Sequence, residues 1–343
     1  MRTLLITGGA GFIGSNFVKH WYENHPGDHI VVLDNLTYSG RVNNIPPHIL
    51  QDNKRFEFCL GNVCSIELVN NLVKKADIVV HFAAESHVTR SILDSRIFFE
   101  TDVFGTHTLC NAILKSCESV ERLIHISTSE VYGSAITVPM NEDHPLNPCS
   151  PYASAKCGAD RLVYSFFKTY GLPCTILRPF NQYGPYQHLE KAIPRFIVST
   201  IKDEPLTVHG DGTARRDWLY VEDTCRRIEA AIMAPIEKVK GEVFNLGSGS
   251  SYSILEIAEM ILSLMHKPKS LITHVGDRLG QVEHHLSSTE KAENILGISP
   301  GRSFEEGLKQ TIKWYQNNEA WWSEIEWMKH VKVLTKSGLE EYH

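Results

Sequence analysis

The chain has 343 residues with a formal net charge of −6, and 42% of the residues are hydrophobic and 22% charged. This length and composition suit a globular protein with one large or two smaller cores, and they exclude an intrinsically disordered chain. Because the charge is acidic and no block of like charges occurs, we expect neither nucleic acid nor a membrane surface as the main partner. A small molecule is the expected partner.

Cysteine usage and the start of the chain set the expected compartment. The eight cysteines show no CxxC and no paired Cys/His spacing of the kind that zinc sites use, so we expect neither a disulfide framework nor a metal. The chain begins directly with a strand pattern, and no run of about eighteen apolar residues occurs, so no signal peptide and no membrane span are expected. The default compartment is cytoplasmic.

The first predicted strand, Thr3 to Thr7, ends in the glycine-rich turn Gly8-Gly-Ala-Gly-Phe-Ile-Gly14 and passes into a helical pattern. Backbone N–H groups at such a helix start can hold a pyrophosphate. A second strand over 30–33 ends in Asp34, about twenty residues after the last glycine, where a carboxylate can accept both ribose hydroxyls. An acid there favours NAD over NADP, so the pattern predicts an NAD site.

Strands and helices then alternate. After a turn-rich loop over 35–55, further strands are expected over 56–60, 78–82, 123–126 and 174–177, with helices over about 65–74, 95–117 and 152–170. Six strands separated by helices predict an α/β fold with a Rossmann-type, doubly wound parallel sheet. Ligands of such sheets lie beyond the carboxyl ends of the strands, where the glycine turn falls.

A set of candidate acid and base residues follows the fifth predicted strand. Thr128 and Glu130 come directly after it, and the next helix carries Tyr152 and Lys156 four residues apart, on one face. Tyrosine is a poor base at its free pKa of about 10, but a nearby cation favours the phenolate. We therefore expect Tyr152 to take an alcohol proton near neutral pH.

These motifs identify a family. The chain resembles the extended short-chain dehydrogenases/reductases of the NAD-dependent nucleotide-sugar epimerase/dehydratase family, and within it the dTDP-glucose 4,6-dehydratases. The resemblance covers nearly the whole chain and rests on TGGAGFIGSNF (7–17), DNLTYSG (34–40), HFAAESHVTRSI (81–92), STSEVYG (127–133), SPYASAK (150–156), RPFNQYGPYQHLEKAIP (178–194), HGDGTARRDWLYVED (209–223) and GEVFNLGSG (241–249).

The resemblance implies three sets of site residues. The catalytic set comprises Thr128, Ser129, Glu130, Tyr152 and Lys156. Besides Tyr152 and Lys156, the NAD-binding set comprises Gly8, Gly11, Phe12, Ile13, Gly14, Asp34, Asn35, Asn62, Val63, Ala83 and Ala84. The set for a nucleotide-sugar substrate comprises Ser86, His87, Asn181, Glu190, Lys191, Arg216, Asn245 and Arg278, while Arg195 and Arg215 stay undecided.

The resemblance also implies a domain plan. An NAD-binding Rossmann domain over 1–187 would be completed by about 217–249 and 303–325. Residues 188–216 and 250–302 would form a smaller, discontinuous α/β lobe that binds the nucleotide sugar, and 326–343 a C-terminal extension. We further expect a homodimer through the apolar helices over 95–117 and 152–170, which hold Ile97, Phe98, Val103, Leu109, Leu162, Val163, Phe166 and Phe167.

Several positions depart from the dTDP-glucose dehydratase pattern. Ser129 stands where the usual general acid is an Asp, and Asp102 stands for an Asn in the helix that faces the cofactor. Further departures are Asn62 for an Asp, Thr89 for an Asp, Leu189 for a Pro, and the run over 281–285. The Ser-Thr-Ser-Glu version is shared with GDP-mannose 4,6-dehydratases and UDP-glucuronate decarboxylases, so the base (UDP, dTDP or GDP) and the sugar stay open.

Glu130 decides between the activities in the family. A C4 epimerase needs only a Ser or Thr with the Tyr and Lys, whereas a dehydratase also needs a base for the C5 proton of the 4-ketone. Glu130 therefore favours a 4,6-dehydratase, in which it also carries the proton to O6, because a Ser129 hydroxyl is too weak an acid. The alternatives are a decarboxylase or epimerase with the same C4 oxidation, or a non-catalytic NAD-bound scaffold.

Overall fold

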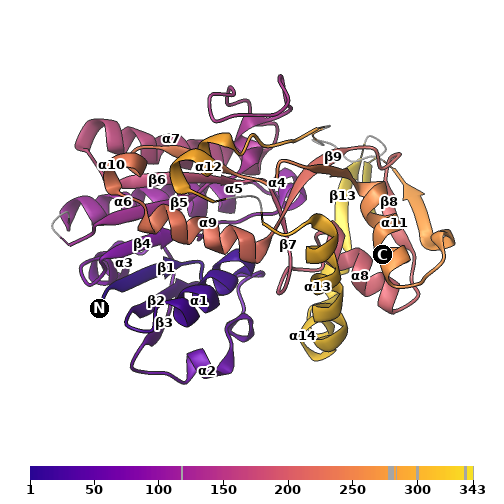
Figure 1. The fold of residues 1–343 in the computed structure, drawn as a ribbon, viewed down its shortest axis with the longest axis horizontal. Coiled ribbons are helices and arrows are strands. Elements are labelled where there is room, and N and C mark those ends of the chain that lie inside the picture. The colour runs from indigo at the N-terminus through magenta and orange to yellow at the C-terminus, as the bar shows by residue number, and fades with distance from the viewer. Residues whose placement is uncertain (117–118, 277–281, 283, 299–300, 336–337, 343) are drawn as a thin grey trace.

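The computed structural model describes residues 1–116, 119–276, 282, 284–298, 301–335 and 338–342. A seven-stranded parallel sheet is the centre of its larger lobe (Figure 1). The strands are β1 (Thr3–Thr7), β2 (His29–Asp34), β3 (Phe56–Leu60), β4 (Ile78–His81), β5 (Arg122–Ile126), β6 (Cys174–Pro179) and β10 (Val243–Leu246). Their spatial order is β10-β6-β5-β4-β1-β2-β3, so the chain reverses direction across the sheet between β1 and β4. Such a switch point opens a crevice at the carboxyl ends of the strands.

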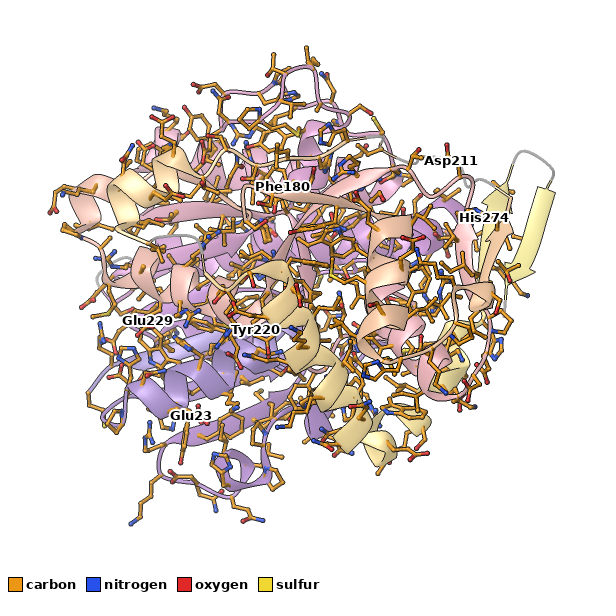
Figure 2. The ribbon with its side chains drawn as sticks, turned by 45° about the vertical axis from the view of Figure 1, so that its right-hand side comes forward. Glu23, Phe180, Asp211, Tyr220, Glu229 and His274 are labelled. Atoms are coloured by element: carbon orange, nitrogen blue, oxygen red, sulfur yellow. The ribbon has the colours of Figure 1, made fainter. Side chains whose placement is uncertain are left out.

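The six predicted strands are confirmed, and β10 is a seventh that the sequence patterns left out. Helices cover both sheet faces, as expected for a doubly wound sheet. One face packs on α1 (Phe12–Asn24), α9 (Val221–Met233) and α12 (Glu290–Leu296), and the other on α3 (Ile66–Val73), α6 (Gly105–Lys115) and α7 (Pro151–Tyr170). Figure 2 shows Glu23 of α1 and Glu229 of α9 on these neighbouring helices. Glu229 accepts from His20 and His25 of the α1 region, each over 2.6 Å, which ties the two helices together.

The helix expected over 95–117 runs without interruption from Arg96 to Lys115 in the structure, but its middle is π-helical. It consists of α5 (Arg96–Phe98), the π-helical segment η2 (Phe99–Phe104) and α6, and it is preceded by α4 (Val88–Leu93). A π-turn adds one residue to a turn and occurs often at functional sites. Here the η2 segment directs Asp102 inward, where the side chain is buried and accepts a hydrogen bond from the Glu85 N–H over 2.8 Å.

The smaller lobe has its own core. It contains the pairs β8 (Leu206–His209) with β12 (Ile272–Val275), and β9 (Arg215–Tyr220) between β7 (Asn181–Tyr183) and β11 (Ser251–Ser253). Its helices are α8 (Ala192–Ile201), α11 (Ile254–Leu264), α13 (Phe304–Asn317) and α14 (Glu319–Ser323).

Two expected domain boundaries are corrected by this packing. The apolar side chains of α13 and α14, among them Leu308, Tyr315 and Trp322, lie in the core of the smaller lobe, although we had assigned 303–325 to the Rossmann domain. Conversely, α12 lies in our expected sugar lobe, yet its Ala292 packs into the core of the large sheet. These boundaries could not be predicted correctly because the apolar pattern of a helix shows that it is amphipathic, but not which core it packs against.

The remaining elements are short. They are η1 (Val42–Asn44), α2 (Pro47–Leu50), η3 (Ser129–Tyr132), α10 (Ile236–Val239), η4 (Lys269–Leu271), η5 (Glu326–Lys329), β13 (Val331–Thr335) and β14 (Gly338–Tyr342). Within the described ranges, no helix combines the length and the apolar character that crossing a bilayer requires.

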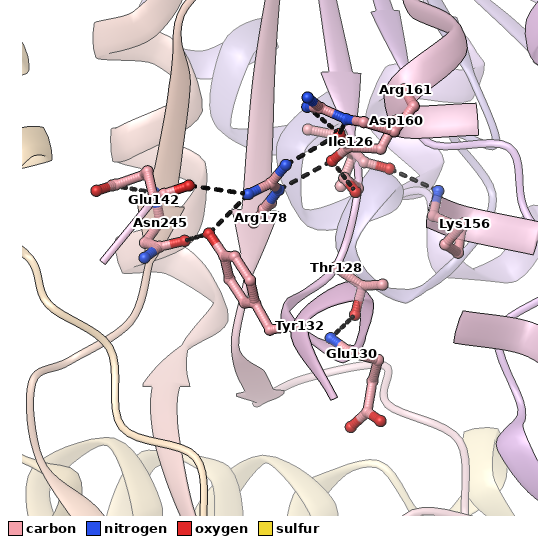
Figure 3. A network of polar contacts seen from close by, with 11 residues as sticks. Ile126, Thr128, Glu130, Tyr132, Glu142, Lys156, Asp160, Arg161, Arg178 and Asn245 are labelled. Atoms are coloured by element: carbon pink, nitrogen blue, oxygen red, sulfur yellow. Dashed lines mark hydrogen bonds and ion pairs between the residues drawn. The ribbon is translucent and has the colours of Figure 1, made fainter. Parts of the chain in front are cut away.

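A buried ion pair joins α7 to the sheet. Arg178 of β6 reaches Asp160 of α7 with two parallel hydrogen bonds of 2.9 and 3.0 Å, and Ser127 donates to the same carboxylate over 2.7 Å (Figure 3). Burial opposes ionisation of Asp160, but the bonds from Arg178 outweigh it and hold the pKa of this carboxyl well below its usual range. A depressed pKa stabilises the folded state above the unfolded pKa of about 3.9, and this stability is lost as the pH falls.

We predict that Asp160→Asn destabilises the protein by about 3–5 kcal/mol at pH 7, because the buried guanidinium of Arg178 loses its counter-charge. Urea unfolding followed by circular dichroism measures this loss. The matched control is Glu305→Gln, which breaks the exposed pair with Lys309 in α13 and should cost below about 1 kcal/mol. Equal losses in the two variants would contradict the role given to the buried pair.

Candidate active site

A cavity of about 420 Å³ lies between the two lobes, at the carboxyl ends of the parallel strands. Of the predicted site residues that the structure describes, all but Asn245 line this cavity: Gly8, Gly11, Phe12, Ile13, Gly14, Asp34, Asn35, Asn62, Val63, Ala83, Ala84, Ser86, His87, Thr128, Ser129, Glu130, Tyr152, Lys156, Asn181, Glu190, Lys191 and Arg216. Arg278 lies outside the described residues. The structure therefore brings segments from both halves of the chain to one site.

The glycine turn forms one wall of the cavity. Gly8 has a φ of +71°, and a Cβ there would lie 2.5 Å from the backbone nitrogen of Ala83 on the neighbouring strand end. A Cβ on Gly14 would lie 2.2 Å from the carbonyl oxygen of Gly8. Only glycine fits at both positions, because the close contacts are with backbone that cannot move aside. The turn thereby exposes the start of α1 to the cavity, which is the arrangement that holds a pyrophosphate.

Asp34 stands at the end of β2, across from this turn. Its carboxylate oxygens accept hydrogen bonds from the N–H groups of Ala10 (2.9 Å) and Leu36 (2.8 Å). Burial raises the pKa of Asp34, and these two bonds oppose the rise because they favour the carboxylate. Each oxygen keeps a second lone pair, so the fixed carboxylate can still accept a pair of ribose hydroxyls.

The reactive side chains meet where β5 ends and α7 begins. Tyr152 hydrogen-bonds Thr128. Lys156 donates over 2.7 Å to the carbonyl oxygen of Ile126, as Figure 3 shows. Burial raises the pKa of Tyr152, and Asp102 raises it further. The lowered pKa that we expected for this phenol is therefore not produced by the protein groups alone, because the Lys156 ammonium is directed to a backbone carbonyl.

Asp102 is a buried carboxyl beside this lysine. Its Oδ2 atom has no hydrogen-bond partner among the described groups, while Oδ1 accepts from Glu85. Burial raises the pKa of Asp102 and lowers that of Lys156, and each group opposes the shift of the other. The departure from Asn at this position therefore places an ionisable group in direct electrostatic contact with the reactive lysine.

Glu130 stands on the opposite side of Thr128 from the buried network. Its backbone N–H donates to the Thr128 hydroxyl over 3.2 Å, which fixes the first turn of η3 and leaves the half-exposed carboxylate in the cavity wall. A base in this place is separate from the Tyr152 phenol, so two protons of one substrate can be moved by two different groups.

Polar contacts tie the two lobes together at the cavity rim. Lys191 donates over 3.2 Å to the carbonyl oxygen of Ser86, and Glu190 accepts from Tyr38 (3.1 Å) and Arg90 (3.3 Å). The Glu190 side chain is only 1% exposed, so these partners compensate a buried charge. Ser86, Glu190 and Lys191 thus lie together at the cavity rim.

Cationic side chains line the end of the cavity in the smaller lobe. Arg216 lies there on β9, and Arg195 of α8, which the sequence left undecided, lines the same cavity and donates over 3.3 Å to the Thr207 carbonyl oxygen. Guanidinium groups at this end suit phosphate oxygens.

Asn245 corrects one expectation. It is fully buried in β10, where its amide donates to Met140 O over 3.0 Å and accepts from the Tyr132 hydroxyl over 2.7 Å. Asn245 is not among the described residues that line the cavity. We therefore assign it to the framework that holds β10 and η3 (Figure 3).

Other cavity residues were missed by the sequence reasoning. They are Thr37, Glu85, Gln187, His188, Thr207, His209 and Trp218. Glu85 and His188 are embedded in the motifs that carried the family resemblance, and the position of those motifs at strand ends was the signal that pointed to them. His209 begins the motif over 209–223, whereas Thr207 of β8 lies outside every motif that carried the resemblance.

Comparisons with known proteins show which family the chain belongs to. The family model for GDP-mannose 4,6-dehydratase matches residues 5–311. The chain is 40% identical over 326 residues to a dTDP-glucose 4,6-dehydratase of Streptomyces niveus, covering 94% of this chain and 95% of the relative. It resembles the crystal structure of the dTDP-glucose 4,6-dehydratase DesIV of Streptomyces venezuelae with NAD and TYD bound, with a TM-score of 0.88, 38% identity and coverage of 94% and 99%. It also resembles the dTDP-glucose 4,6-dehydratase of Bacillus anthracis in complex with NAD, with a TM-score of 0.86, 38% identity and coverage of 95% and 100%.

The fold and site thus define an extended short-chain dehydrogenase/reductase. The chain belongs to the GDP-mannose 4,6-dehydratase family, within which the relatives above are dTDP-glucose 4,6-dehydratases.

The glycine turn yields a prediction about binding. Gly14→Ala should destabilise the protein by about 1–3 kcal/mol and abolish retention of a dinucleotide, because the added Cβ overlaps the Gly8 carbonyl. Thermal unfolding and cofactor content of the purified protein measure the two effects. Gly27→Ala is the control, since none of the described atoms lies within 4 Å of its added Cβ, and it should change neither. A Gly14→Ala protein with wild-type cofactor content would refute the assignment.

Proposed function

We propose that the protein is an NAD-dependent nucleotide-sugar 4,6-dehydratase, a hydro-lyase that converts a nucleotide-linked hexose into its 4-keto-6-deoxy form. The single observation that carries this proposal is the Glu130 carboxylate in the cavity wall beside Thr128 and Tyr152. An epimerase that acts only at C4 does not need this base. The named relatives, which are dTDP-glucose 4,6-dehydratases, support the same reaction.

The residues of the larger lobe fit NAD. The glycine turn exposes a helix start to a pyrophosphate, and the fixed carboxylate of Asp34 suits the two free hydroxyls of an unphosphorylated ribose. Asn35, Asn62, Val63, Ala83 and Ala84 complete the proposed cofactor wall. When bound, NAD supplies the hydride acceptor of the first step and the hydride donor of the last.

In the first step, we assign removal of the C4 hydroxyl proton to Tyr152. Its partner Thr128 lies beside the phenol and is placed to hydrogen-bond the C4 oxygen. Tyr152 can accept this proton only as the phenolate, so its own proton must leave before the step. Because burial opposes that loss, we assign to Lys156 the stabilisation of the phenolate charge. The result of this step is a 4-ketone.

In the second step, we assign the C5 proton to Glu130. The 4-ketone acidifies C5–H, and a carboxylate in the cavity wall can remove this proton while the C6 hydroxyl leaves as water. Glu130 is protonated by C5 and passes this proton to O6, so the leaving group is water and Glu130 ends the elimination as a carboxylate. Return of hydride to C6 and delivery to C5 of a proton that exchanges with solvent complete the product.

The smaller lobe is assigned to the nucleotide part of the substrate. Arg195 and Arg216 lie in its part of the cavity and suit the diphosphate, while Lys191 and Ser86 lie at the rim near the sugar. His87, Asn181 and Glu190 complete the proposed substrate wall.

The test of the whole proposal is incubation with UDP-, dTDP- and GDP-hexoses, followed by mass spectrometry. Loss of water from one of them is expected, and unchanged mass throughout would contradict it.

Two variants separate the assigned steps. Glu130→Gln keeps the side-chain shape but loses the base, so bound NADH and 4-keto sugar should accumulate while elimination slows by about 10²- to 10⁴-fold. Tyr152→Phe should form no NADH at all, because it blocks the first proton transfer. Stopped-flow absorbance of the nicotinamide measures both. A Glu130→Gln enzyme that dehydrates at the wild-type rate would reject the assignment of the C5 base.

We also propose that the enzyme works as a homodimer in the cytoplasm, where NAD and activated sugars are available. Phe98, Leu109 and Val163, which we had expected at the subunit interface, are buried within one chain. Ile97, Phe99 and Phe104 are instead exposed on α5 and η2, beside α7, and they form the apolar surface that a partner would cover.

Phe104→Glu tests the dimer. The Phe104 side chain is 62% exposed, so the charge should leave the fold intact and convert the dimer to a monomer at micromolar concentration. Light scattering after size-exclusion chromatography measures the mass. Met233→Glu, at a 52% exposed apolar position of α9 on the opposite face of the sheet, should stay dimeric. A monomeric wild type would refute the proposal.

A further inference from the structure

His285 of the smaller lobe lies directly behind Ser129. The ring is fully buried, with Nδ1 3.5 Å from the Ser129 hydroxyl and Nε2 2.6 Å from the carbonyl oxygen of Gly133. Its backbone N–H donates to Arg215 O over 3.1 Å, and Phe180, which is labelled in Figure 2, packs edge-on against the ring at 5.9 Å. The imidazole is therefore held on three sides between the two lobes.

The neighbours of the ring fix its tautomer. A carbonyl oxygen only accepts, so Nε2 must carry the hydrogen that Gly133 receives. Burial lowers the pKa of His285, and although Glu130 and Gly133 oppose this effect, Arg216 and His144 reinforce it. The ring is accordingly neutral, and Nδ1 presents a lone pair to Ser129.

The lone pair on Nδ1 determines the direction of the Ser129 hydroxyl. A serine has one O–H donor and two acceptor sites, and here the donor is committed to His285. The contact of 3.5 Å is long, but hydrogen bonds of catalytic groups often tighten only in the Michaelis complex. Ser129 also lines the cavity, so its remaining lone pairs are available to a substrate hydroxyl there.

We propose that His285 is a positioning residue that makes Ser129 an acceptor for the C6 hydroxyl of the sugar. This inference rests on the proposed function and deepens it. The Ser129 oxygen accepts a hydrogen bond from the C6 hydroxyl, and this hydrogen bond orients a lone pair of O6 toward Glu130. In the elimination, the C5–H electrons form the C5–C6 double bond, the C6–O6 bond breaks toward oxygen, and O6 takes the proton that Glu130 removed from C5. Water leaves, and Ser129 and His285 are unchanged.

A matched pair of variants separates the two hydrogen bonds of the ring. His285→Asn places an amide oxygen near the position of Nδ1 and can still accept from Ser129. His285→Gln reaches the position of Nε2 and can still donate to Gly133, but it lacks the acceptor for Ser129. We expect His285→Gln to slow elimination by on the order of ten-fold or more, with bound NADH accumulating, while C4 oxidation is unchanged. His285→Asn should retain elimination to within a few-fold.

A double-mutant cycle tests whether His285 acts through Ser129. In a Ser129→Ala background, His285→Gln should slow elimination no further, because the hydroxyl that it positions is already absent. Equal slowing in both backgrounds, or equal slowing by His285→Asn and His285→Gln, would overturn the inference.

A measurement that does not depend on turnover tests the role of His285 separately from the proposed dehydratase function. In ¹⁵N-histidine NMR of the full chain, with the His285 signals assigned by their loss in His285→Gln, Nε2 should carry the proton from pH 6 to 8. Ser129→Ala should shift the Nδ1 signal and leave Nε2 unchanged. A protonated Nδ1 in the neutral ring, or an Nδ1 signal that ignores Ser129→Ala, would overturn the inference even in an enzyme that dehydrates its substrate.

Discussion

The bidentate pair between Asp160 and Arg178 is the constraint on which the arrangement of the site depends. Asp160 belongs to α7, the helix that presents Tyr152 and Lys156 at its start, while Arg178 belongs to β6. Ser127, at the end of β5, donates to the same carboxylate. The helix with the phenol and the strand that delivers Thr128 and Glu130 are thus fixed to one buried charge, and a shift of either would leave that charge unpaired.

The two lobes divide the chemistry between them. The larger lobe holds the groups to which we assign the proton transfers and the wall that suits a dinucleotide, whereas the smaller lobe holds the guanidinium groups that suit phosphates. Polar contacts such as Lys191 with Ser86 and Glu190 with Arg90 join the two sides of the cavity. His285 contacts Ser129 and Gly133, and by the role that we propose for it this contact orients a group of the elimination step.

Much of this organisation could be predicted from the sequence. The glycine turn, Asp34 and the Tyr152–Lys156 spacing follow from local backbone and side-chain rules, and each lies where the parallel sheet required it. The π-helical stretch η2 could not be predicted, because apolar periodicity does not show where an extra residue enters a helical turn. Tertiary packing between segments far apart in the sequence decides two further features. It places α12 on the core of the large sheet and α13 in the core of the smaller lobe, and it brings His285 to Ser129.

The central claim is that one hydride leaves C4 and returns to C6 of the same sugar. Deuterium placed at C4 of the nucleotide hexose tests it most directly, with the product examined by NMR and mass spectrometry in the presence of unlabelled external NADH. The account predicts deuterium at C6 of the 4-keto-6-deoxy product, with no label in external NADH. A product that keeps its C6 hydroxyl, or a label that appears at C4 or in external NADH, would contradict it.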